Sequence, residues 1–97
     1  MKMLAIEKEV PGVKDAQFTA DLLKSEAAKA WELHMSDVIR EMYFSADKHE
    51  AVLVLECATI EDARRSLSQL PLVRAGLIAF DVIPLMPYNG FSRLFGS

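Results

Sequence analysis

The segment Ala51-Val52-Leu53-Val54-Leu55 constrains the fold most strongly, because it is apolar at every position. A strand with one face in water alternates apolar and polar residues, so this strand is expected to be covered on both faces. The chain has 97 residues, enough for one domain with one core. Its hydrophobic content of 52% is high for a lone domain of this size, which predicts contact with another subunit.

Strand and helix patterns alternate along the chain. The predicted order is strand, helix, strand, strand, helix, strand, over residues 2–10, 16–35, 38–45, 50–57, 60–70 and 77–83. This is the ferredoxin-like βαββαβ order of the α+β class, a four-stranded antiparallel sheet with two helices on one face. Because the helices cover only one face, the apolar strand predicts a second sheet on the other, as in a dimeric α+β barrel.

The first predicted helix carries a stripe of small residues that includes Ala20, Ala27 and Ala30. Small side chains favour a helix lying close to the sheet, and Asp15 is the expected N-cap. The whole chain, residues 1–97, is expected to form a single domain ending in a C-terminal arm, residues 84–97. Aromatic residues in this arm predict docking on a neighbouring subunit or closure over a cleft, the alternative being a strap across its own domain.

Composition excludes several classes of function. A net charge of −3 without a basic run argues against nucleic-acid binding, and no apolar stretch approaches the roughly 20 residues that span a bilayer. The single cysteine, Cys57, rules out an intramolecular disulfide and agrees with a cytoplasmic location. Nucleotide, dinucleotide, hydrolase and zinc motifs are missing, so no cofactor and no metal are expected.

Three residues are candidate catalytic groups. Glu26 flanks the buried stripe of the first helix and could face a cleft, and His34 lies within that stripe as a candidate acid or base. Arg40 begins a strand among apolar neighbours, where its guanidinium could receive a carboxylate or polarise a carbonyl. The alternatives are a packed histidine bonded to one neighbour, and an arginine paired with Glu26 or Glu41.

Four more residues are candidates for substrate binding. Glu7 and Asp81, on the first and last strands, are expected to point into the space between the two sheets, and Glu41 and Tyr43 share one face of the second strand. Burial there would raise the carboxylate pKa values and suit one group to proton transfer. The alternative is that these residues lie at a solvent-exposed edge of the sheet. His49 is expected to be a solvated turn residue.

The segment Leu67-Ser68-Gln69-Leu70-Pro71-Leu72, which joins the second helix to the last strand, resembles the muconolactone isomerase family, whose Q-L-P-L turn it contains. Similar residues stand elsewhere in that family at the positions of Pro11, Asp15, Leu22, Glu26, Leu33 and Arg40. The resemblance runs from the first strand to the last. It implies a dimeric α+β barrel, often assembled into rings, and a cofactor-free double-bond shift in an unsaturated lactone during aromatic compound catabolism.

Departures from the family concern its second strand. The pattern W-R-x-x-W-R is here Ile39-Arg40-Glu41-Met42-Tyr43-Phe44, and the following Gly-His is Asp47-Lys48. These changes alter the expected ligand-facing wall and remove a histidine. The resemblance implies an isomerase, in which Glu26 is the expected base and Arg40 is expected to hold the dienolate or a substrate carboxylate. The alternative is a non-catalytic module of the same fold that binds a small apolar ligand or serves oligomerisation, and haem or oxygen chemistry rests on fold analogy alone.

Overall fold

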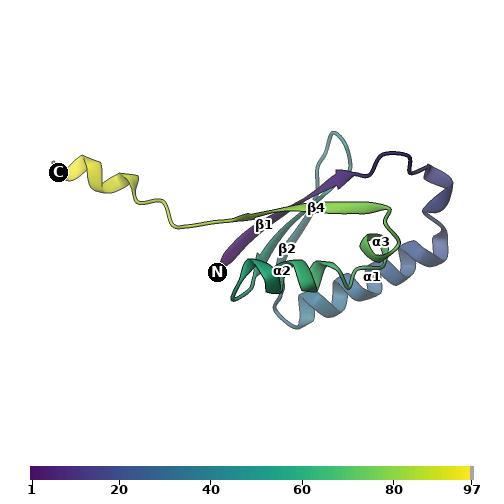
Figure 1. Ribbon diagram of the computed structural model, residues 1–97. Helices are drawn as coiled ribbons and strands as arrows, with labels where there is room; N and C mark the ends of the chain where they lie inside the picture. The colour runs from purple at the N-terminus through teal and green to yellow at the C-terminus, as the bar shows by residue number, and fades with distance from the viewer. Residues whose placement is uncertain (97) are drawn as a thin grey trace.

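The computed structural model describes residues 1–96, and its strands and helices follow the predicted order (Figure 1). The strands are β1 (Lys2–Glu9), β2 (Ile39–Phe44), β3 (Ala51–Glu56) and β4 (Ile78–Pro84). They form one sheet in the order β2-β3-β1-β4, with every neighbouring pair antiparallel. The helices α1 (Ala20–Met35), α2 (Ile60–Leu67) and α3 (Pro71–Arg74) lie on one face of it. The predicted ferredoxin-like α+β fold is confirmed.

Helix α1 begins later than predicted. Thr19, not Asp15, is its N-cap, because the Thr19 Oγ1 accepts a hydrogen bond from the Leu22 N–H at 3.2 Å. Asp15 lies in a separate 3₁₀ turn, η1 (Asp15–Gln17). Thr59 caps α2 in the same way, accepting from the Asp62 N–H at 3.0 Å, as the sequence predicts. The N-terminal end of each main helix is thus fixed by a threonine hydroxyl.

The second helical segment is divided in two. Helix α2 ends at Leu67, and Pro71 then starts the one-turn helix α3. Proline suits the first position of a helix because its fixed φ fits and its missing N–H would be unpaired there. The Gln69-Leu70-Pro71-Leu72 turn therefore starts a new helical turn, where the sequence predicts a direct passage to the last strand.

The core lies between the sheet and α2. Met3 and Ala5 of β1 and Leu55 of β3 are fully buried, and they pack with Ala63 and Leu67 of α2. Leu33, near the C-terminal end of α1, closes the same cluster. Small residues would allow α1 to lie close to the sheet, but Ala27 and Ala30 line a cavity between the helix and the strands.

The opposite face of the sheet carries no helix. Val52 and Val54 of β3 point to this face with Leu4 and Ile6 of β1, and all of them are half-buried within the single chain. Ile83 of β4, on the same face, is 42% exposed. This apolar surface, the bare face, has the side chains that the sequence predicts should meet a second sheet.

The C-terminal arm extends away from the domain (Figure 1). After β4 the chain runs extended to a 3₁₀ turn, η2 (Gly90–Phe95). Tyr88, Phe91, Leu94 and Phe95 are between 67% and 82% exposed. Tyr88 and Phe91 contact each other edge to face, with ring centroids 4.9 Å apart. The strap alternative therefore does not hold in the single chain.

Replacing Leu55 with alanine is expected to lower the free energy of unfolding by about 2 to 5 kcal/mol, because it opens a cavity in the core. The control substitution Met35→Ala, at a side chain that is 63% exposed at the end of α1, is expected to change it by less than about 0.5 kcal/mol. Urea denaturation followed by circular dichroism measures both. Equal losses would contradict this description of the core.

Candidate functional site

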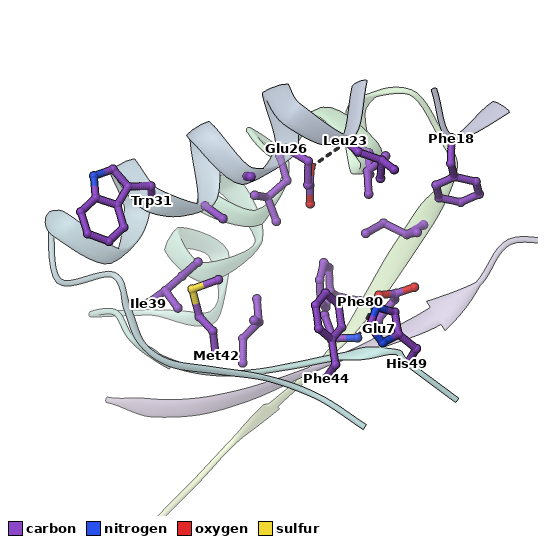
Figure 2. Close-up of a pocket in the computed structure, with 17 residues that line it drawn as sticks. Glu7, Phe18, Leu23, Glu26, Trp31, Ile39, Met42, Phe44, His49 and Phe80 are labelled. Carbon is purple, nitrogen blue, oxygen red and sulfur yellow. Dashed lines mark hydrogen bonds between the residues drawn. The ribbon is translucent and has the colours of Figure 1, made fainter. Parts of the chain in front are cut away.

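A cavity of about 650 Å³ lies between α1 and the helix-covered face of the sheet. Ala27 and Ala30 of α1 leave part of this space open opposite the large side chains of the strands. The wall is mostly apolar, formed by Leu23, Ala27, Ala30 and Trp31 from α1 and by Ile39, Met42, Phe44, Leu53 and Phe80 from the strands (Figure 2). An apolar hollow with a few polar groups is the usual form of a small-molecule site.

Glu26 is the polar group that α1 contributes to this cavity (Figure 2). Its Oε1 accepts a hydrogen bond from the Leu72 N–H at 2.9 Å. Leu72 is the second residue of α3, so its N–H has no acceptor within that helix. Burial raises the pKa of Glu26 above 4.5, although the Leu72 hydrogen bond opposes this. The carboxyl is thus held in place and made more basic.

Glu7 of β1 is the second carboxylate of the cavity. Its Oε1 accepts a hydrogen bond from the N–H of Ala51, the first residue of β3, at 2.9 Å. The Glu7 side chain lies on the sheet side and Glu26 on the helix side of the same space (Figure 2). The charge of Glu7 also raises the pKa of Glu26, as a smaller contribution than burial.

His49 and Phe44 form one end of the cavity. Their rings stack with centroids 4.0 Å apart and an angle of 17° between the planes. His49 has a φ of 56°, which is uncommon for a residue other than glycine. The prediction of a solvated turn residue is therefore incomplete, because the exposed imidazole also lines the cavity. No sequence signal indicates this, since the ring position depends on the hairpin conformation and on the stack.

Arg40 and His34, predicted to act with Glu26, do not line the cavity. An irregularity in β2 between Ile39 and Glu41 changes the register there, and the exposed Arg40 donates from Nε to the Asp37 carbonyl at 2.8 Å. His34 is exposed, with its Nδ1 2.9 Å from the Ile39 carbonyl oxygen. Of the three predicted catalytic residues, Glu26 alone lies in the cavity. The alternative, a pairing of Arg40 with Glu26 or Glu41, is also not found.

Glu41, Tyr43 and Asp81 lie on the bare face. Glu41 and Tyr43 share that face as predicted, and the Tyr43 hydroxyl donates to the Glu41 Oε1 at 2.6 Å, which raises the pKa of Tyr43. Asp81 pairs with Lys8 at 3.0 Å. The prediction that Glu7 and Asp81 point into one space is wrong, because Asp81 is opposite Ile6 in the register and Glu7 is opposite Phe80.

Within residues 1–96, no group of three or more His, Cys, Asp or Glu side chains is placed to hold a metal ion. None of the helices found there is long and apolar enough to cross a membrane.

Solved structures of two enzymes are similar to the chain over nearly its whole length. Muconolactone isomerase superposes with a TM-score of 0.75, covering 92% of this chain and 92% of its own, at 20% sequence identity. The chain has the muconolactone isomerase fold. The 5-chloro-2-hydroxyhydroquinone dehydrochlorinase of Burkholderia phenoliruptrix AC1100, solved with 2,5-dihydroxybenzoquinone, superposes with a TM-score of 0.66 at 19% identity, covering 93% of this chain and 98% of its own.

By sequence alone, no family model and no curated protein matches the chain. The structural superposition nevertheless confirms, at the level of the fold, the resemblance to muconolactone isomerase that the Q-L-P-L turn indicates. At this identity the shared fold does not transfer a reaction, which depends on the residues of the site.

The carboxyl carbon of Glu26, followed by NMR, is expected to titrate with a midpoint above 4.5, because burial disfavours the ionised form. Glu7→Gln is expected to lower that midpoint without returning it to 4.5, since burial is the larger cause. Glu61→Gln, on the exposed surface of α2, is the control and is expected to leave it unchanged. A Glu26 midpoint at or below 4.5 would contradict this account.

The same shift predicts how stability depends on pH. Because the pKa of Glu26 is raised in the folded chain, its contribution to stability is fully present below the unfolded-state pKa and is lost as the pH rises through the folded-state pKa. The free energy of unfolding of the natural chain, minus that of Glu26→Gln, is therefore expected to fall as the pH rises from the unfolded-state pKa through the higher folded-state pKa of Glu26. Urea titrations of both chains measure this difference. A difference that rises with pH would show that folding lowers the pKa of Glu26, which contradicts the prediction.

Proposed function

We propose that the chain is a cofactor-independent isomerase that shifts a double bond in an unsaturated lactone or a related cyclic carbonyl compound. The observation that carries the proposal is Glu26, a carboxyl group of raised pKa held by the Leu72 N–H at the wall of an apolar cavity. A general base works best when its pKa lies near the working pH, and burial moves Glu26 in that direction. The shared fold with muconolactone isomerase is consistent with such chemistry.

The proposed step is a proton transfer within one substrate molecule. The ionised Glu26 removes a proton from a carbon next to the carbonyl or to the double bond, and the electron pair of that C–H bond is delocalised as a dienolate. The protonated Glu26 then returns the proton to the carbon two positions away, so the double bond moves and Glu26 is ionised again. Glu7 is proposed as a binding group on the opposite wall.

For the assembly we propose a dimer, alone or within a larger ring, whose two bare faces pack against each other. The apolar Leu4, Ile6, Val52 and Val54 would form the centre of a two-fold symmetric contact. Glu41, Tyr43 and Asp81 would lie in the same contact, outside the cavity of the single chain. A cytoplasmic location and a role in aromatic compound breakdown belong to the same proposal, the first resting on the single cysteine.

The reaction is tested by proton NMR in D₂O with muconolactone, its methyl ester and uncharged butenolides. Migration of the double bond, or protein-dependent deuterium uptake at the allylic carbons, is the expected result. Glu26→Gln is expected to lower the rate by about 10² to 10⁴, because it removes the base while a side-chain oxygen remains to accept from Leu72. Full turnover by a folded Glu26→Gln protein would remove Glu26 from this role.

Glu61→Gln, with the same charge change outside the cavity, is expected to keep the natural rate. Unchanged spectra for every lactone, with the protein folded and oligomeric, would favour the second candidate, a non-catalytic binding module. The observation that favours this candidate is the apolar cavity itself, which suits ligand binding without any reaction.

Ending the chain after Leu85 is expected to lower the mass of the assembly measured by light scattering. The deleted arm has highly exposed aromatic side chains that we propose pack on a neighbouring subunit. Because β4 ends at Pro84, the shortened chain keeps all four strands, which circular dichroism verifies. An unchanged mass would show that the arm plays no part in assembly.

A further inference from the structure

The charges around the cavity have one sign. Glu7 and Glu26 both line it, and among residues 1–96 no Lys or Arg side chain does so. His49 is the one further ionisable side chain in the wall described above. A ligand inside this cavity therefore faces two carboxyl groups across an otherwise apolar space.

The hollow beside the cavity has the same character. A second space of about 240 Å³ shares Glu7, Phe18 and His49 with the cavity and adds Glu9, Asp15 and Glu50. Lys48 is the cation that joins them in its wall. Acidic side chains therefore outnumber the cation in the adjoining wall as well, and a negative potential lowers the local concentration of anions.

The residue best suited to hold a substrate carboxylate lies elsewhere. Arg40 is exposed, does not line the cavity, and uses its Nε to bond the Asp37 carbonyl. An anion in the cavity would lose its hydration and gain no guanidinium or ammonium partner, while two like charges lie in the same walls. A carboxylate is therefore the least suitable polar group for a ligand of this chain.

We infer that the cavity selects an uncharged cyclic ligand whose polar group donates a hydrogen bond to Glu26 or Glu7, and that it discriminates against carboxylate anions. This inference rests on the proposed function for its substrate class, because it separates neutral lactones that carry a hydroxyl group, and cyclic amides, from lactone acids. For an organic cation, the loss of hydration against the extensive apolar wall opposes the attraction of Glu7 and Glu26, so the uncharged ligand is expected to bind more tightly. Carboxyl oxygens supply acceptors, so the matching ligand group is a hydroxyl or an amide N–H.

Binding of three ligands that share one ring tests the inference. Indoleacetamide, indoleacetate and tryptamine are uncharged, anionic and cationic at neutral pH, and their dissociation constants are measured by ligand-detected NMR with the full chain. Indoleacetamide is expected to bind at least about tenfold more tightly than indoleacetate, and more tightly than tryptamine. Equal or tighter binding of either ion, or no binding of any of the three, overturns the inference.

Charge variants connect the discrimination to the cavity. Glu26→Gln and Glu7→Gln are each expected to reduce the preference for indoleacetamide over indoleacetate by at least about threefold, because each removes a like charge from the wall. Glu61→Gln changes the net charge equally from the surface of α2 and is expected to leave the preference unchanged. The same reduction in all three variants would assign the preference to overall charge and overturn the inference.

These measurements do not depend on turnover. A protein that prefers indoleacetamide but moves no double bond would end the proposed reaction and leave the ligand class in place. A protein that isomerises lactones but prefers indoleacetate would support the proposed reaction and overturn the inferred ligand class.

Discussion

The alternation of side chains along β1 is the constraint on which the rest of the structure depends. Met3 and Ala5 point to the helix-covered face and are fully buried, and Glu7 is the next residue on that face. Two residues of a strand span about 7 Å, so the passage from packed core to cavity occurs within one step of the pleat. Ile6, between Ala5 and Glu7, points to the bare face. A shift of one residue in this strand would turn Met3, Ala5 and Glu7 to the bare face and bring Leu4 and Ile6 to the helix-covered face, so the cavity would lose its carboxylate on the sheet side.

Much of the fold follows from sequence patterns that depend on local rules. The order of strands and helices, the hairpin at residues 46–49 and the threonine cap of α2 arise from alternation, turn composition and capping, all of which act over a few residues. Glu26 was also predictable as a cavity residue, because helical spacing places it beside the buried stripe. Its hydrogen bond to Leu72, 46 residues away, was not, since that partner comes from a turn brought close by the tertiary fold.

The sequence misassigns several site residues because their positions depend on backbone and tertiary geometry that local patterns do not specify. Arg40 lies outside the cavity because β2 changes register beside it, and His49 lines the cavity because of a backbone φ that no propensity favours there. The alanines of α1 are a third case. Small side chains permit close packing but do not enforce it, and opposite Phe44 and Phe80 they leave room for a ligand. The helical spacing of residues predicts which way a side chain of α1 points, but not how far it lies from the sheet opposite.

The short turn that begins at Pro71 also affects Glu26. The Leu72 N–H favours the ionised carboxyl, while burial favours the protonated one, so the fold stabilises each state by a different means. When Glu26 takes up a proton, it accepts more weakly from Leu72 and the first turn of α3 loses part of its cap. Release of the proton restores that contact. A group that must act first as a base and then as an acid benefits from this balance, because neither protonation state of the carboxyl is favoured by every contact around it.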